Sequence, residues 1–270
     1  MFRAFLGAWA LGLALVAAQA GAGPPDTITD APSQLRILTF NIRHGEGWDG
    51  MVDISRAVGV IRDQQADLVA LQEVDQGTLR VGGARQADQL GELTGLHAAF
   101  GKAMDYQGGE YGVAVLSRWP LRQVSNQALP HADGYEPRTL LSVEVDPFAS
   151  GRAIVFSTTH LDQGRESPNR LAQVGTINQR LATRDTPSIL AGDFNSRFDT
   201  EPMSTIRSLW SDMWLEPAPA DPNVRPRYKV DYVLARPAGR WRSVEGRAVE
   251  AAGVSDHRAI LVVLELAGIS

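Results

Sequence analysis

The sequence predicts an α/β fold in which two packed sheets are flanked by helices. From residue 35 onward, short apolar runs of strand length alternate with segments that repeat apolar residues at helical spacing. Strand candidates outnumber helix candidates, and a single sheet of about ten strands would tend to curl or split. Two sheets packed against each other, with helices on their outer sides, accommodate both observations.

Strands are expected where a short run of apolar or β-branched residues stops at a turn or at a polar residue. These runs are 35–40, 67–72, 111–117, 139–145, 153–159, 188–192, 229–235 and 258–266. The length of 270 residues suits one large globular domain, or at most two small ones.

Three helices are expected between these strands. Asp53 is an N-cap for a first helix, whose apolar face carries Ile54, Ala57, Val58 and Ile61. A second helix spans 86–94 and ends at Gly95. A third opens at Pro168, a residue that the first turn tolerates, and carries Leu171, Val174, Ile177 and Leu181. The Pro-rich, charged segment 216–227 is expected to be a loop, and no repeat or long linker divides the domain 34–270.

The N-terminus reads as a secretory signal peptide over residues 1–20. Arg3 precedes the apolar run 4–16, and Ala18-Gln19-Ala20 matches an A-x-A cleavage pattern. The alternative is an uncleaved membrane anchor, but the run is short for a span of about 20 residues. We therefore expect a secreted or periplasmic protein with no transmembrane span after cleavage, and a flexible lead-in over 21–33.

Composition narrows the possible chemistry. The chain has 270 residues, no cysteine, and 26 basic against 31 acidic residues, for a net charge of −5. This balance leaves no broad cationic surface for a polyanion, although a local Arg-rich face would still bind phosphate. Only Lys102 and Lys229 are lysines, so the basic residues are almost all arginines. Arg is the better phosphate ligand, but a codon bias toward Arg on a solvated surface explains this excess of arginine equally well. Without cysteine, disulfides, thiolate catalysis and Cys-based zinc sites are excluded.

Polar residues follow four of the apolar strands and predict one composite site. They are Asn41, Glu73, His160 and the pair Asp193 and Asn195, and the segment "SDHRA" (255–259) precedes the last strand. Functional residues collect beyond the carboxyl ends of strands, because the strand fixes them and the loop exposes them. Carboxylates and amides are hard oxygen donors suited to Mg²⁺, Mn²⁺ or Ca²⁺, and no HExxH zinc motif occurs.

Seven motifs in order resemble the endonuclease/exonuclease/phosphatase superfamily. They are "LTFNIRHGEGWDG", "DLVALQEVD", "GVAVLSRWPL", "STTHLD", "LAGDFNSR", "VDYVLA" and "SDHRAI", and they cover about residues 35–266. The resemblance implies a four-layer α/β/β/α sandwich and metal-dependent cleavage of a phosphoester, with Mg²⁺ or Mn²⁺ as the cofactor.

The resemblance also implies roles for individual residues. Glu73 would be the principal metal ligand, supported by Asn41, and Asp256 would bind or approach the metal. Asp193 would position and deprotonate the attacking water, which Asn195 would orient. His257, held in one tautomer by Asp231, would stabilise the phosphoryl oxygens, and His160 would contact the phosphate or assist the leaving oxygen. Arg43, Arg138 and Tyr111 are weaker candidates for substrate contacts.

Each of these residues has a structural alternative. Glu73 could end its strand as a surface carboxylate, Asp193 and Asn195 could form an Asx-turn, and His257 and Asp231 could be structural. An exposed salt bridge would equally explain either arginine. His44, His97 and His131 are expected to be surface or structural residues. Because strand residues alternate in direction, Phe194 should point into the core, while Asp193 and Asn195 share a face with Glu73 and His257.

The sequence leaves the substrate class open. The leading hypothesis is a phosphodiesterase or phosphomonoesterase that acts as a monomer on a phosphoester substrate, with no stable protein partner. A secreted nuclease on DNA or RNA is the nearest alternative. The acidic net charge argues against it, but a local positive potential in the cleft would be enough to bind nucleic acid. The absence of a hydrophobic hairpin weakens a sphingomyelinase reading. A non-catalytic phosphate-binding protein on the same fold is the alternative from another class.

Overall fold

The computed structural model describes residues 33–148, 151, 153–164, 168–181, 185–215 and 229–267. The expected signal peptide, nearly all of the expected lead-in and the Pro-rich segment 216–227 lie outside these residues. Across the described ranges, no helix is long and apolar enough to span a membrane.

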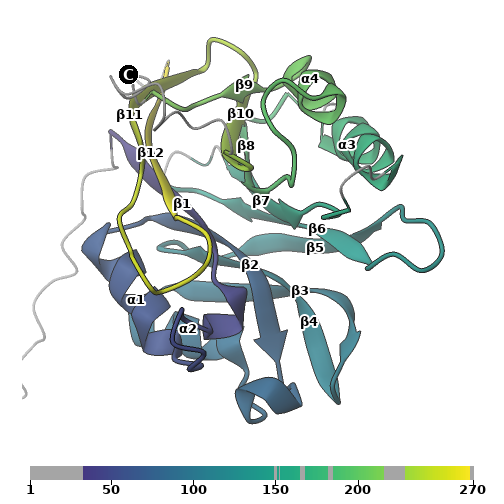
Figure 1. Cartoon of the computed structure of the whole chain (residues 1–270). Helices are drawn as coiled ribbons and strands as arrows, with labels where there is room; N and C mark the ends of the chain where they lie inside the picture. Colours follow the sequence, from purple (N-terminus) through teal and green to yellow (C-terminus); the bar gives the residue numbers. More distant parts are fainter. Residues whose placement is uncertain are drawn as a thin grey trace, which may run out of the picture. The chain divides into compact units, whose positions relative to one another are not determined.

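Two mixed sheets of six strands each form the centre of the fold (Figure 1). The first has the order β11-β12-β1-β2-β4-β3 and comprises β1 (Leu35–Asn41), β2 (Leu68–Gln76), β3 (His97–Tyr106), β4 (Gly109–Ser117), β11 (Trp241–Ala248) and β12 (Ile260–Leu266). The second has the order β5-β6-β7-β8-β10-β9 and comprises β5 (Arg122–Leu129), β6 (Arg138–Val145), β7 (Ile154–His160), β8 (Ser188–Asp193), β9 (Ser211–Asp212) and β10 (Asp231–Arg236). Only β1 with β2 and β7 with β8 pair in parallel, so the carboxyl ends of these strands lie side by side within each sheet.

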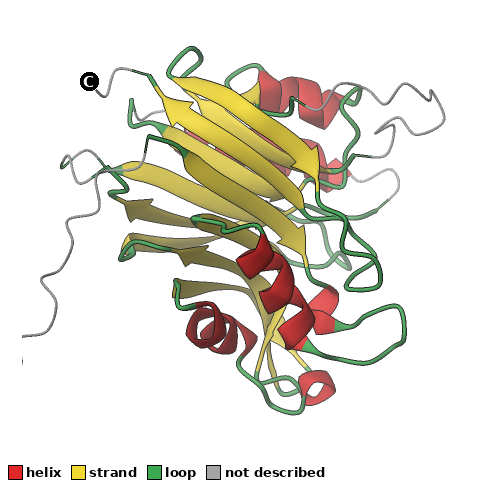
Figure 2. Ribbon diagram, turned by 90° about the vertical axis from the view of Figure 1, so that its left-hand side faces the viewer, coloured by secondary structure: helices red, strands yellow, loops and turns green. Residues whose placement is uncertain are grey.

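Helices cover the outer face of each sheet (Figure 2). Helices α1 (Ile54–Asp63) and α2 (Gln86–Thr94) pack on the first sheet, and α3 (Pro168–Leu181) and α4 (Glu201–Arg207) pack on the second. Two short 3-10 turns, η1 (Arg43–Gly45) and η2 (Leu79–Val81), follow β1 and β2. The predicted four-layer α/β/β/α sandwich is confirmed.

Alternation along the strands divides the apolar residues among three cores. On β1, Leu35 and Ile37 belong to the core between the sheets, whereas Leu38 and Phe40 pack beneath α1 and α2. On β8, Ile189 and Ala191 face the other sheet, whereas Leu190 packs beneath α3 and α4 together with Phe194. A strand buried on both sides explains the continuous apolar run before Asp193, and the expected burial of Phe194 is confirmed.

The predicted helices have the expected ends. Asp53 caps α1 by accepting a hydrogen bond from the Ser55 amide at 2.9 Å, and Gly95 ends α2 in a left-handed conformation with φ of 75°. In α3, however, Leu171 is exposed rather than part of the apolar face.

Four strands and one helix were not expected from the sequence. Strand β5 lies at a sheet edge with mostly exposed side chains, and β3 is only partly buried. β9 has two residues, β11 is another edge strand and α4 has seven residues. Edge strands and short helices bury little surface, so their sequences show little of the apolar periodicity on which the predictions depend.

Gly192 is required by the close approach of β7 and β8. Its φ is 157°, and a Cβ at this position would lie 2.1 Å from the Thr159 carbonyl oxygen. We predict that Gly192→Ala destabilises the protein by at least about 3 kcal/mol, because the overlap involves backbone atoms that cannot rotate away. Urea unfolding measures the change, and Gly175→Ala, at a helical site with open space around it, is the control. Equal stability of the two variants would contradict the packing described here.

Candidate active site

Polar strand ends from both sheets meet at one edge of the sandwich. The inward-facing residues of β1 change from Ile37 to Thr39 and then Asn41, and those of β7 change from Phe156 to Thr158 and then His160. Asn41 and His160 both contact Asp193 at the end of β8. The apolar core between the sheets therefore ends in a layer of ionisable and amide side chains.

A β-bulge turns Glu73 toward this layer. The register between β2 and β4 shifts between Gln72 and Val74, and Glu73 has a φ of 57°. Regular alternation would place Glu73 on the side opposite Gln72, whose side chain faces the second sheet. The extra residue instead brings the Glu73 carboxylate to 3.0 Å from Asn41 Nδ2. Bulges and left-handed non-glycine residues are costly and concentrate at functional sites.

Asn41 links carboxylates of the two sheets. Its Nδ2 donates to Glu73 Oε1 at 3.0 Å and to Asp193 Oδ2 at 3.3 Å, and its Oδ1 accepts the Arg43 amide at 3.1 Å. The amide nitrogen, not the oxygen, therefore faces the carboxylates. This geometry favours a supporting role for Asn41 over direct ligation of a metal.

Asp193 is buried among hydrogen-bond donors. It is 1% exposed, and its Oδ1 accepts a hydrogen bond from the backbone amide of Asn195 at 2.8 Å. This bond forms the Asx-turn that was one of the two interpretations of Asp193 and Asn195. The Asn195 side chain instead donates from Nδ2 to the Leu161 carbonyl at 2.9 Å, with a backbone φ of 46°. Asn195 thus fixes Asp193 through its backbone and ties β8 to the end of β7 through its side chain.

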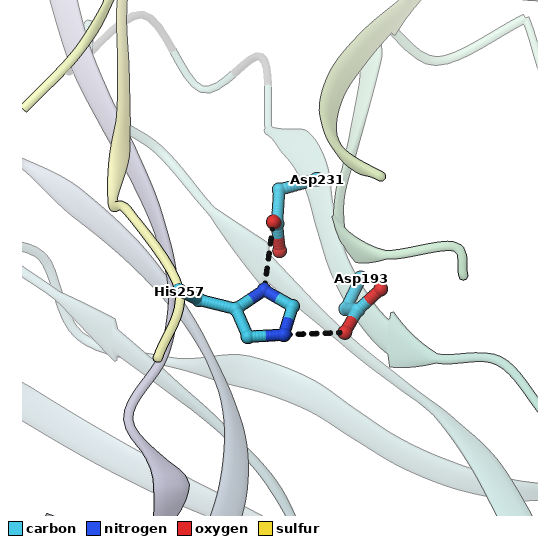
Figure 3. A group of neighbouring side chains, drawn as sticks. All are labelled: Asp193, Asp231 and His257. Atoms are coloured by element: carbon cyan, nitrogen blue, oxygen red, sulfur yellow. Dashed lines mark hydrogen bonds and ion pairs between the residues drawn. The ribbon is translucent and has the colours of Figure 1, made fainter. Parts of the chain in front are cut away.

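His257 joins the two sheets at the site (Figure 3). Its Nδ1 lies 2.9 Å from Asp231 Oδ2 and its Nε2 lies 3.7 Å from Asp193 Oδ2. The preceding Ser255 holds this loop in place, because its hydroxyl donates to the Asn41 carbonyl at 2.8 Å. With Nδ1–H donating to Asp231, the imidazole presents Nε2 to Asp193.

The charges of this cluster shift its pKa values. Burial raises the pKa of Asp193 and the charge of Asp231 raises it further, against the lowering effect of His257 and of the hydrogen bonds from Asn195 and Asn41. Burial alone would lower the pKa of His257, but the hydrogen bond and charge of Asp231 together with the charge of Asp193 outweigh it and raise the pKa to about 9. A buried carboxylate that gains protons readily, next to an imidazole that retains its proton, suits acid–base chemistry.

His160 has the opposite character. It is 4% exposed, and its Nε2 lies 3.4 Å from Asp193 Oδ2. Burial, together with the positive charges of Arg138 and His257, lowers its pKa well below the ordinary value. A neutral imidazole favours a hydrogen bond to phosphate over proton donation to a leaving group.

Tyr111 and Arg138 lie beside His160. All three lie around one narrow gap, too small for a water molecule, that is lined by residues of β3, β4, β6 and β7, and Arg138 is 2% exposed. Arg138 Nη1 pairs with Glu136 Oε1 at 3.1 Å, and burial, followed by the charges of Glu73 and Glu136, raises the pKa of Tyr111 well above its ordinary value. Glu136 was not singled out in the sequence; its position two residues before Arg138 in the same segment was the only signal.

Two other candidates lie farther out. Asp256 is exposed, and its Oδ1 lies 3.2 Å from the Ser255 hydroxyl oxygen. The Arg43 side chain is 36% exposed and forms a salt bridge with Glu46 at 3.2 Å. Such a salt bridge is the alternative to a substrate contact that the sequence left open for Arg43. Of the remaining histidines, His44 is buried against Glu46, and His97 and His131 are exposed.

The donor set fits a hard divalent cation. Among the described residues, Asp193, Asp231 and His257 offer ligand atoms that all lie within 4.8 Å of one another. Asp231 Oδ1 is buried without a hydrogen-bond partner in this part of the chain, and Asn41 holds Glu73 to Asp193. The carboxylate oxygens suit Mg²⁺ or Mn²⁺, and the His257 ring, protonated beside Asp231, lies next to them as a hydrogen-bond donor. This group differs from the set Glu73, Asn41 and Asp256 expected as ligands and shares no residue with it.

The two histidines should titrate far apart in the metal-free protein. We predict that ¹⁵N NMR finds the His257 ring protonated at pH 7.5, losing its proton near pH 9, and the His160 ring neutral at the same pH of 7.5. Because the folded-state pKa of His257 is raised, its stabilising contribution is complete below about pH 6.5 and is lost as the pH rises through about 9. His257→Gln and His160→Gln assign the signals. Protonation of His160 above pH 6.5, or of His257 only below it, would contradict the electrostatics of the site.

The four-layer α/β/β/α sandwich, with ionisable side chains from both sheets at one edge, defines the fold class of the protein. The model of the endonuclease/exonuclease/phosphatase family matches residues 38–257, and the chain belongs to this family. The predicted resemblance is confirmed.

One curated relative and two solved structures are similar to the chain. The chain is 29% identical to the uncharacterized protein YbhP of Escherichia coli (strain K12) over 59% of its own length and 66% of that protein, so it spans just under two thirds of the curated relatives it matches. It is similar to the endonuclease/exonuclease/phosphatase from Beutenbergia cavernae, at 26% identity and a TM-score of 0.72 over 88% of this chain and 72% of that chain. A mannosyl-6-phosphatase of Bacteroides thetaiotaomicron has the same fold, at 17% identity and a TM-score of 0.65 over 85% of this chain and 99% of that chain.

Proposed function

We propose that the protein is a divalent-metal-dependent phosphoesterase that hydrolyses a phosphodiester or phosphomonoester with water activated by Asp193. The observation that carries the proposal is the buried Asp193 carboxylate, held by Asn41 and the Asn195 amide between His160 and His257. Phosphoester hydrolysis needs a base for the water, a cation for the phosphate oxygens and neutralisation of charge in the transition state. The cluster offers a candidate for each.

The residues of the chain divide these tasks. A bound Mg²⁺ or Mn²⁺, held by Glu73 together with oxygens of the cluster, would neutralise phosphate charge and polarise the phosphorus–oxygen bond. Asp193 accepts the proton of the attacking water as the new phosphorus–oxygen bond forms and the bond from phosphorus to the leaving oxygen breaks, and the departing alkoxide takes up a proton from solvent water. The protonated ring of His257, fixed by Asp231, donates a hydrogen bond to a phosphoryl oxygen, and neutral His160 contacts a second one.

The proposal includes export of the protein from the cytoplasm and a monomeric state. The charged start, apolar run and Ala18-Gln19-Ala20 pattern support export to the periplasm or the medium. A mildly acidic chain supports a small phosphoester over long duplex DNA as the substrate. We expect a monomer with no stable protein partner.

A matched assay tests this proposal. The purified protein is given a chromogenic phosphodiester, a chromogenic phosphomonoester, plasmid DNA and sphingomyelin, each with Mg²⁺, Mn²⁺ or a chelator. We expect turnover of at least one substrate, lowered about 100-fold or more by the chelator and restored by added metal. Plasmid cleavage alone would favour the nuclease alternative. Binding of phosphate without turnover of any substrate would favour a non-catalytic protein.

A further inference from the structure

A polar layer crosses the core directly beneath the candidate site. Gln72 Nε2 donates to Thr158 Oγ1 on the other sheet at 3.0 Å and to Thr39 Oγ1 on its own sheet at 3.3 Å. Gln72 Oε1 lies 3.4 Å from Thr39 Oγ1. All three side chains are 0% exposed, so these contacts are made without access to water.

This layer is unusual for its surroundings. Below it, the core between the sheets is apolar, with Ile37 and Phe156 preceding Thr39 and Thr158 by one inward position on their strands. A buried amide is costly unless its hydrogen bonds are made. The bond from Gln72 to Thr158 therefore forms only at one separation and one register of the two sheets, whereas apolar contacts tolerate small shifts.

Each member of the layer is next to a residue of the site. Thr39 is two residues before Asn41, Thr158 is two residues before His160, and Gln72 immediately precedes the bulged Glu73. Asn41 and Glu73 come from the first sheet, and His160 and Asp193 come from the second. The site is therefore assembled across the gap that the Gln72–Thr158 bond spans.

We propose that Gln72, through Thr158, is a positioning residue that fixes the spacing of the two sheets at the site and so places Glu73 and Asn41 against Asp193 and His160. The inference rests on the proposed function, because it assigns Gln72 a part in the same reaction. Residues that support metal ligands through a second set of contacts typically contribute 10- to 100-fold in metal affinity or activity. A displacement of about 1 Å has a similar effect on rate.

Two neighbouring threonines provide a matched test. Thr158→Val removes the acceptor on the second sheet and keeps the shape of the side chain. Thr159→Val is the control, because Thr159 is equally buried and donates one hydrogen bond, to the Thr139 carbonyl at 2.9 Å within its own sheet. Both full-length variants are assayed, well below their unfolding temperatures, for kcat, KM and the Mn²⁺ concentration that gives half-maximal activity.

We expect Thr158→Val to lower kcat about 10- to 100-fold and to raise the half-maximal Mn²⁺ concentration about 10-fold. In Thr159→Val, kcat and the half-maximal Mn²⁺ concentration should each change less than about 3-fold. A merely structural role would lower the unfolding temperature of both variants and leave the Mn²⁺ requirement unchanged, which would overturn the proposal. If Thr158→Val fails to fold, the variant Thr39→Val/Gln72→Met/Thr158→Val leaves no polar group unpaired in the layer. Wild-type kcat and Mn²⁺ requirement in that variant would overturn the proposal too. An inactive wild-type protein would instead refute the proposed function itself.

Discussion

Replacing Asp193 with Asn is expected to lower kcat about 1,000-fold without weakening the fold. Asp193 is a buried carboxylate that lies within 3.7 Å of both imidazoles, and removal of a general base typically costs about 10²- to 10⁴-fold. Because burial and the charge of Asp231 raise the pKa of Asp193, its ionised form is unfavourable in the folded protein. The neutral amide should therefore keep or raise the unfolding temperature, so that any loss of rate is chemical.

Asp67 provides the control for this substitution. It is another buried carboxylate, 3% exposed, directly before β2 and so at the end of that strand away from Glu73. It accepts the Arg36 amide at 2.8 Å and pairs with Arg118 at 2.9 Å. Asp67→Asn should keep most of its kcat. An Asp193→Asn protein that retained more than about a tenth of the wild-type kcat would remove Asp193 from the role of base.

Replacing Asp231 with Asn is expected to lower kcat/KM about 100- to 1,000-fold and to shift its pH dependence. Asp231 accepts Nδ1–H of His257 and is the main reason that the pKa of His257 is raised against the effect of burial. Without this charge the pKa of His257 falls, so the ring loses its proton at a lower pH. The alkaline decline in activity should therefore move to lower pH than in the wild-type protein.

The pH profile separates this role from a structural one. A variant that is only less stable would lose activity by the same factor at every pH at which it is folded. Glu46→Gln is the matched control, since it removes the carboxylate 3.1 Å from His44 in a second histidine–carboxylate pair outside the site. An unchanged alkaline decline in Asp231→Asn would show that His257 does not act as a protonated group.

The sequence predicted the elements that are buried and periodic. The central strands β1, β2, β7 and β8 have continuous apolar runs because both of their faces are covered. The burial of Phe194 followed from simple alternation. The edge strand β5 could not be predicted in this way, because its exposed residues carry no burial pattern.

The candidate site was predictable in membership but not in geometry. Asn41, Glu73, His160, Asp193, Asp231 and His257 all lie at one edge, because adjacent strands end there. The bulge that turns Glu73 inward, however, depends on the register with β4, which no local signal in "LQEVD" indicates. The turn of the Asn195 side chain toward Leu161 and the pairing of Glu136 with Arg138 are tertiary contacts of the same kind. Local sequence gives the direction of a strand, whereas such contacts depend on segments far apart in the chain.

The most direct test of the account is anomalous X-ray scattering from crystals grown with Mn²⁺. We expect one strong peak at the edge of the sandwich, roughly 2–2.5 Å from a carboxylate oxygen of Glu73 and beside the cluster of Asp193, Asp231 and His257. The peak should vanish in Glu73→Gln crystals grown in the same way. A wild-type crystal with no Mn²⁺ at this edge, or with Mn²⁺ bound only elsewhere on the protein, would contradict the central claim that Glu73 and the neighbouring cluster form a divalent-metal site.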